Sequence, residues 1–196
     1  MAKKRKRSKA NFSVIALITR IVVFALLVGT LFVPFSNGLK MTVEVPILGN
    51  VVSTYKPAFA FMFGGELVSE NATFEVLNVS AIALIGYLLI AISAALLLVS
   101  FILKNNKKMV GGILLFAAFA CVLTGSILMF CSHESLAAVL AGAMIGGEPS
   151  ANEINTALRN TTLEFGIWGV GMFGIISAVG LVVSYVFDGP INKILK

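Results

Sequence analysis

The stretch VSAIALIGYLLIAISAALLLVSFIL-KNNKK-MVGGILLFAAFACVLTGSILMF, residues 79–130, decides the fold of this chain. Two apolar segments, residues 79–103 and 109–130, flank a short connection that holds three lysines. A helix needs about 20 apolar residues to cross the hydrocarbon core of a bilayer, and each segment is longer than this. Backbone amides in lipid must be satisfied within the segment, which favours a helix over a strand. The stretch therefore predicts two membrane-spanning helices joined by a short basic turn.

Two further apolar stretches, residues 14–35 and 165–187, are of similar length. At 58% hydrophobic and 12% charged residues, the chain is more apolar and less charged than a soluble domain. The bulky Phe32-Val33-Pro34-Phe35 is unlike a signal-peptide cleavage site, so we interpret the first stretch as a retained anchor. We expect an all-α integral membrane protein with one bundle of four transmembrane helices.

Charge is sorted between the segments that connect these stretches. One set carries eleven basic residues: Lys3, Lys4, Arg5, Lys6, Arg7, Lys9, Lys104, Lys107, Lys108, Lys193 and Lys196. The other set has only Lys40, Lys56 and Arg159, against eight glutamates. By the positive-inside rule, the tails 1–13 and 188–196 and the loop 104–108 are predicted to be cytoplasmic. Residues 36–78 and 131–164 are then the outer loops.

The basic N-terminal tail is expected to set this orientation and to attract anionic lipid, rather than to bind nucleic acid. No eukaryotic sorting signal and no cysteine pair in the outer loops is evident, which favours a bacterial plasma membrane. Cys121 and Cys131 lie ten helical residues apart and are too distant to bridge each other.

The first outer loop contains the pattern of a small extracellular β-hairpin. Apolar Leu39, Met41, Val43 and Val45 alternate with polar residues, and this period of two is typical of a half-buried strand. Pro46 ends the alternation, Gly49-Asn50 supplies a turn, and residues 51–55 form a plausible returning strand. Because a two-stranded hairpin is marginal in water, we expect it to lie over the outer ends of the helices.

The segment AFAFMFGG, residues 58–65, is unusually apolar for an outer loop. Exposed apolar patches of this kind mark interaction surfaces. We therefore predict a partner-binding surface made of Phe59, Phe61, Met62, Phe63, Val43 and Val45. The alternative is an interface anchor that is folded onto its own bundle.

The second outer loop has two predicted parts. Residues 136–145 are apolar but too short to span, which suits an interfacial or shallow re-entrant helix. Ser150 and Glu153 then have the spacing of a capping box, which predicts a short helix that leads to the fourth span near Thr161.

Small residues recur on single faces of the apolar helices. The predicted helix-packing positions are Gly166, Gly169, Ser177, Gly180, Ser184, Gly86 and Ser93. Small residues let helix backbones approach closely in lipid, so packing within the bundle explains them. A glycine-lined pore or a seam between two copies is the alternative.

The predicted spans contain one charged residue, Arg20. Its long side chain could extend back to the cytoplasmic headgroups or face a site within the bundle, and we favour the headgroups. Asp188 is a possible partner near the same interface. His133 is the only histidine, whereas a zinc site usually needs three or four protein ligands. No catalytic, metal or cofactor motif is evident.

The arrangement of four spans with a strand-bearing first outer loop and a shorter second loop is similar to that of claudin-like tetraspan proteins. The tryptophan and paired cysteines expected in the first loop of that family are missing here, and Trp168 lies in the fourth span. The resemblance is one of topology and implies no function. We expect a non-enzymatic accessory or scaffold subunit that binds a protein partner through its outer loops. The alternative is a component of a membrane transporter or channel.

Overall fold

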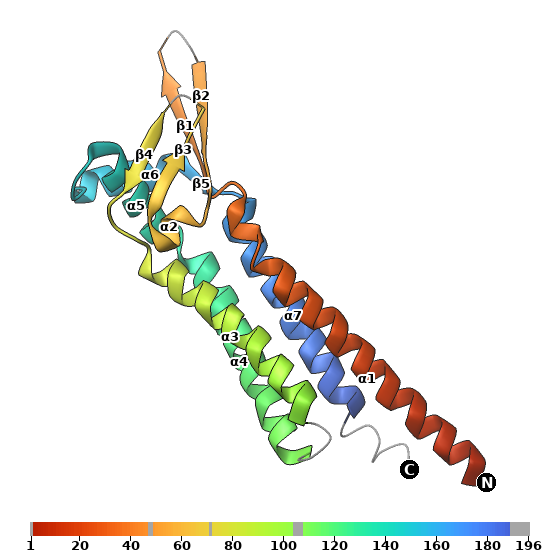
Figure 1. Cartoon of the computed structure of the whole chain (residues 1–196). Coiled ribbons are helices and arrows are strands. Elements are labelled where there is room, and N and C mark those ends of the chain that lie inside the picture. The colour runs from red at the N-terminus through yellow and green to blue at the C-terminus, as the bar shows by residue number, and fades with distance from the viewer. Residues whose placement is uncertain (1, 47–48, 71, 104–107, 189–196) are drawn as a thin grey trace.

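The computed structural model describes residues 2–46, 49–70, 72–103 and 108–188, with a long helical bundle and a head of strands and short helices at one end (Figure 1). The bundle consists of α1 (Ala2–Thr30), α3 (Ala81–Leu103), α4 (Lys108–Cys131) and α7 (Phe165–Asp188). Each contains or adjoins a stretch of 20 to 23 residues that is long and apolar enough to cross a membrane. This confirms the prediction of four such helices.

The helices associate as two pairs. α3 packs against α4, α1 packs against α7, and contacts between α4 and α7 join the pairs. The start of α1 and the end of α7 lie at the end of the bundle far from the head (Figure 1). α1 already begins at Ala2, so most of the predicted tail 1–13 belongs to this helix. The predicted loop 104–108 and tail 188–196 lie almost entirely outside the described residues.

The predicted hairpin is present and belongs to a three-stranded antiparallel sheet. β1 (Leu39–Val45) pairs with β2 (Gly49–Tyr55) from Leu39 opposite Tyr55 to Val45 opposite Gly49. On the other side, β1 pairs with β5 (Thr161–Leu163), which lies directly before α7. The strand order is β2-β1-β5. The two connections therefore fold together in one head, which the sequence patterns did not predict.

A second hairpin in the first connection was also not predicted. β3 (Gly65–Val68) pairs with β4 (Thr73–Val76), and one bridge between Lys56 and Val68 links this hairpin to the lower end of β2. The backbone N–H of Lys56 donates to the Val68 carbonyl oxygen at 3.1 Å, and the N–H of Val68 donates to the Lys56 carbonyl oxygen at 2.8 Å.

The first hairpin extends away from the bundle instead of lying over the helix ends (Figure 1). At its base, Leu39 and Tyr55 are buried, whereas Val43 and Val51 nearer its tip are 38% and 40% exposed. The expected position was wrong because β5 and the helices of the second connection cover the base of the hairpin. Two strands alone are only marginally stable in water, and these contacts at the base stabilise the hairpin.

The second connection forms α5 (His133–Ile145) and α6 (Ala151–Asn160). α5 packs against β4, α2, β5 and α6, so it forms the core helix of the head. It ends at Gly146, whose left-handed φ of 69° is typical of a helix C-terminus. The predicted capping box is confirmed at Ser150 and Glu153, where α6 begins.

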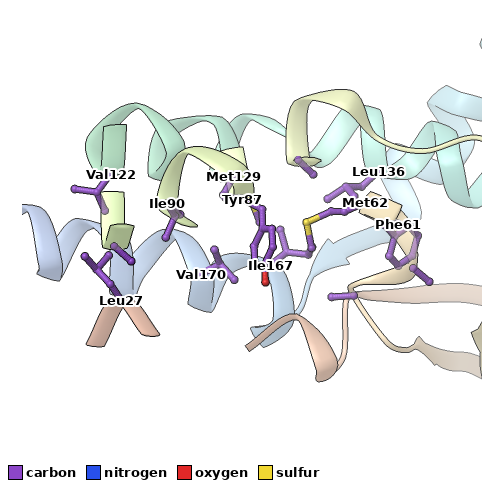
Figure 2. Packing of buried hydrophobic residues seen from close by; sticks show 14 of the residues in the cluster. Leu27, Phe61, Met62, Tyr87, Ile90, Val122, Met129, Leu136, Ile167 and Val170 are labelled. Carbon is purple, nitrogen blue, oxygen red and sulfur yellow. The ribbon is translucent and has the colours of Figure 1, made fainter. Parts of the chain in front are cut away.

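One continuous apolar core runs from the bundle into the head. Figure 2 labels some of its members: Leu27, Val122, Ile90, Val170, Met129, Tyr87 and Ile167 in the bundle, and Met62, Leu136 and Phe61 toward the head. Since side chains from α1, α3, α4 and α7 meet those of α2 (Ala60–Phe63) and α5 in one cluster, the bundle fixes the position of the head.

Candidate interaction site in the head

The aromatic segment predicted to bind a partner forms the joint between head and bundle. Phe61 and Met62 in α2 are fully buried. The backbone N–H of Ala58 donates to the Ser36 carbonyl oxygen at 2.9 Å, and that of Ser80 donates to the Phe61 carbonyl oxygen at 2.8 Å. These bonds tie α2 to the chain leaving α1 and to the chain entering α3. A partner could not reach Phe61 or Met62 in this fold, which corrects the expectation for these two residues.

Phe59 and Phe63 lie at the surface of the same joint. Phe59 stacks on Phe35 with ring centroids 5.3 Å apart and on Phe63 at 4.2 Å. Phe63 then meets Tyr87 edge-on at 5.8 Å. Phe63 is 43% exposed and Phe59 is partly buried. A row of aromatic rings where apolar helices meet a polar head suits an interface anchor, the alternative described above.

Val43 and Val45 lie on the hairpin, near its tip. Val43 stands opposite Val51 in the register, so the two side chains share one face of the sheet, whereas Val45 is half-buried. Val52 lies on the opposite face and is 41% exposed. Of the predicted partner-binding residues, Phe63 and Val43 are therefore the exposed ones, and Val43 shares an apolar patch with Val51.

An apolar groove of about 270 Å³ opens at the base of this face. β1, α5 and α6 line it with Met41, Ala141, Met144, Ile145, Asn152, Glu153, Thr156 and Ala157. The hydroxyl of Tyr55 donates to the sulfur of Met41 at 3.9 Å, and burial raises the pKa of Tyr55. Sequence reasoning missed the groove because its walls come from three separate segments.

The carboxylate of Glu153 stands at the rim of the groove. It accepts hydrogen bonds of 2.7 Å from both the backbone N–H and the hydroxyl of Ser150. These bonds lower the pKa of Glu153, because they favour the ionised form. The groove thus combines an apolar floor with a negative charge at its rim.

The predicted helix-packing residues lie at close contacts, with neighbouring helices for most of them and with the connection after α1 for Gly166. A Cβ atom on Gly166 would stand 2.5 Å from the Asn37 carbonyl oxygen, and one on Gly180 would collide with Val23 of α1. On α3, a Cβ atom on Gly86 would stand 3.0 Å from the Gly125 carbonyl oxygen. The other positions are also at contacts: Gly169 against Val33 and Phe165, and Ser93, Ser177 and Ser184 fully buried. These glycines face neighbouring side chains and backbone, as close packing of a bundle requires.

Arg20 is only 5% exposed and lies between α1 and α7. Its Nε donates to the Ser184 hydroxyl at 2.8 Å, and that hydroxyl donates to the Ala16 carbonyl oxygen at 3.4 Å. The structure therefore places the side chain in the contact between these two helices. The side chain of Asp188, considered above as its partner, lies outside the described residues.

Among the residues that the structure describes, no cluster of three or more His, Cys, Asp or Glu side chains could hold a metal ion. His133 Nε2 lies 3.2 Å from the Thr161 hydroxyl and links α5 to β5. Cys121 is partly buried, Cys131 is exposed, and both are free thiols. No protein-family model matches this chain, and no curated protein sequence matches it either.

Proposed function

We propose that this protein is a non-enzymatic accessory or scaffold subunit that binds another protein through its head. In this proposal the four apolar helices span a bacterial plasma membrane, both termini are cytoplasmic, and the head faces outward. The charge sorting along the chain supports this orientation, since basic residues collect in the tails and in the 104–108 connection. The basic tail would hold anionic lipid at the inner surface.

The exposed upper half of the hairpin is the observation that carries the proposal. β5 and α6 contact β1, and α5 packs against β5, whereas Val43 and Val51 stand together on one exposed face. Clustered apolar side chains on an exposed hairpin favour protein binding, because the patch loses contact with water when a partner covers it. The base of the hairpin, at Leu39 and Tyr55, belongs to the apolar core of the molecule. The hairpin is therefore already formed before a partner binds.

Transport is the other function class that the apolar helices suggest, and no specific contact favours it. Within the described spans, Arg20 is the one charged side chain, and it is hydrogen-bonded to Ser184. The predicted packing glycines lie against neighbouring helices and side chains.

The test is co-purification of the tagged full-length chain in mild detergent, with co-eluting proteins identified by mass spectrometry. The variant Val43→Lys with Val51→Glu replaces the apolar pair by opposite charges, which are compatible with directly opposed strand positions. Val68→Glu is the control, because Val68 is 40% exposed in the head but lies on β3, where a glutamate would stand opposite Lys56. We expect the double variant to lose a protein that wild type and control retain. Identical co-eluting proteins for all three chains would contradict the proposal.

A further inference from the structure

We propose that a groove between α4 and α7 binds one anionic phospholipid, with an acyl chain in the groove and the headgroup at the inner end of the bundle, far from the head. This inference rests on the membrane arrangement of the proposed function and adds a lipid site to it. The groove has a volume of about 230 Å³ and is lined by Leu115, Phe116, Phe119, Leu181, Val182 and Tyr185. All six residues belong to stretches long and apolar enough to cross a membrane.

This α4–α7 groove has a buried floor and exposed walls. Leu115 and Leu181 are buried members of the apolar core, whereas Phe116 and Tyr185 are 71% and 54% exposed. Five of the six lining side chains are hydrocarbon, and the sixth, Tyr185, adds one hydroxyl group. Such a lining favours an acyl chain, because it supplies van der Waals contacts and would leave most polar ligand groups without a hydrogen-bond partner. A bilayer around the spanning helices brings acyl chains directly to this surface.

The α4 side of the groove is open toward the inner end. Phe116 and Phe119 follow Gly112 by four and seven residues, so the three residues lie on one face of the helix. No described atom lies within 4 Å of a Cβ atom placed at Gly112, so there is free space on this face one turn before the groove. Gly112 is four residues, or about 6 Å along the axis, from Lys108 at the start of α4. A chain in the groove can therefore continue along this face to the end of the helix.

Tyr185 marks the depth at which the headgroup would lie. It is three residues before the end of α7 at Asp188, or about 4.5 Å along the helix axis. Tyrosine is enriched at membrane–water interfaces, where its ring contacts apolar groups and its hydroxyl contacts polar ones. At this depth the hydroxyl can donate a hydrogen bond to a phosphate oxygen while the ring lines the groove.

The charge at the inner end favours an anionic headgroup. The sequence segments at this end, residues 1–13, 104–108 and 188–196, carry eleven basic residues and one acid, Asp188. Arg20 adds a further cation, which is buried in the contact between α1 and α7. The eight glutamates all belong to the two connections that form the head. Basic pockets between transmembrane helices on the cytoplasmic side are typical binding sites for anionic headgroups.

The test is a lipid titration of the purified full-length protein in uncharged detergent, followed by native mass spectrometry. Phosphatidylglycerol is the anionic probe, and phosphatidylcholine with the same acyl chains is the neutral control. We expect one phosphatidylglycerol molecule to bind, with an affinity about tenfold or more above that of phosphatidylcholine. Tyr185→Phe keeps the ring and removes the hydroxyl, so it should reduce this preference.

Two substitutions fill the groove from different helices. Val182→Trp enlarges a side chain of its wall, and Gly112→Leu occupies the free space on α4. Val179→Trp is the matched control, because Val179 is 58% exposed on the same helix and does not line the groove. We expect both groove variants to weaken phosphatidylglycerol binding about tenfold or more and the control to bind as wild type does. Circular dichroism verifies that the variants keep the helix content of wild type.

Equal affinity for the two phospholipids, equal weakening by Val179→Trp, or binding unchanged in both groove variants would each overturn the inference. An equal affinity for glycerol phosphate, which has no acyl chain, would also overturn it, because the groove would then contribute nothing. Loss of a co-purifying protein from Val182→Trp, with lipid binding unchanged, would assign the groove to a partner helix instead. The proposed docking function is judged separately by the Val43→Lys/Val51→Glu variant, so a failed lipid titration would leave it intact.

Discussion

Gly86 and Gly125 bring α3 and α4 into close contact where the two helices face each other. A Cβ atom on Gly125 would stand 2.6 Å from the Gly86 carbonyl oxygen and 2.9 Å from Cγ1 of Ile90. A backbone oxygen cannot move aside as the end of a flexible side chain can, so even one methyl group forces the helices apart. The contact between this pair therefore depends on the absence of two side chains.

We accordingly expect Gly125→Ala to destabilise the protein by about 1–3 kcal/mol, the range for overpacking a close contact. Gly112→Ala is the matched control on the same helix, because no atom lies within 4 Å of a Cβ at Gly112. The control should be neutral or slightly stabilising, since alanine favours helix more than glycine does. Unfolding of both variants in detergent, followed by circular dichroism, measures the difference. Equal stability of the two variants would contradict the assigned contact.

The segment AFAFMFGG, residues 58–65, shows that composition alone does not predict which apolar side chains of a loop are buried. Its composition predicts either an exposed surface or an anchor, because both require apolar side chains. Burial of Phe61 depends on Gly38, where a Cβ atom would stand 2.8 Å from the Phe61 ring. That contact joins residues from different parts of the connection, and no local pattern encodes it.

At the scale of elements, α6 is defined by the signal at its start. The Ser150 hydroxyl accepts from the Glu153 N–H at 3.4 Å, and the Glu153 carboxylate accepts from the Ser150 N–H at 2.7 Å. This reciprocal pair satisfies two backbone N–H donors at the helix start. α6 also supplies a wall of the groove, so its stability bears on the candidate site.

The lowered pKa of Glu153 predicts a pH dependence. Its contribution to the stability of α6 is fully present above the ordinary carboxyl value of 4.5 and is lost as the pH falls through the lower, folded-state value. Glu153→Gln should speed amide exchange in residues 151–160 at neutral pH, and the ratio to wild type should approach one in acid. Glu148→Gln, in the exposed segment before α6, is the control. A ratio independent of pH would contradict the role of the ionised carboxylate.

Elements with strong local signals were predictable and the others were not. A pattern within a single segment predicts each of the following: the four apolar helices, the strand at residues 39–45 and the capping box. β5 has three residues and β3 and β4 have four each, which is too short for a period of two to stand out. Their pairing depends on segments that meet only after the bundle has formed. The groove lined by β1, α5 and α6 follows from that pairing, so it could not be predicted.

The two ends of the molecule differ: the head is at one end, and the start of α1 and the end of α7 are at the other (Figure 1). The eight glutamates of the two outer connections belong to the head end, and the basic residues of the 1–13 segment belong to the opposite end. The acidic residues are concentrated in the two connections that form the head. The fold therefore places most of the negative charge at one end of the molecule and the basic 1–13 segment at the other. By the positive-inside rule, this distribution supports the proposed orientation, with the head outside and the termini inside.

This orientation predicts the result of cysteine labelling in intact cells. In a chain in which Cys121 and Cys131 are alanine, Glu44→Cys and Ser8→Cys place one thiol each at the head end and in the basic segment. Residue 44 is exposed on the hairpin, so a membrane-impermeant maleimide should label it in intact cells. Ser8→Cys should react only after the membrane is permeabilised, because translocating its six neighbouring basic residues is unfavourable. Labelling of Ser8→Cys in intact cells, with Glu44→Cys protected, would invert the orientation and place the proposed docking patch of Val43 and Val51 inside the cell.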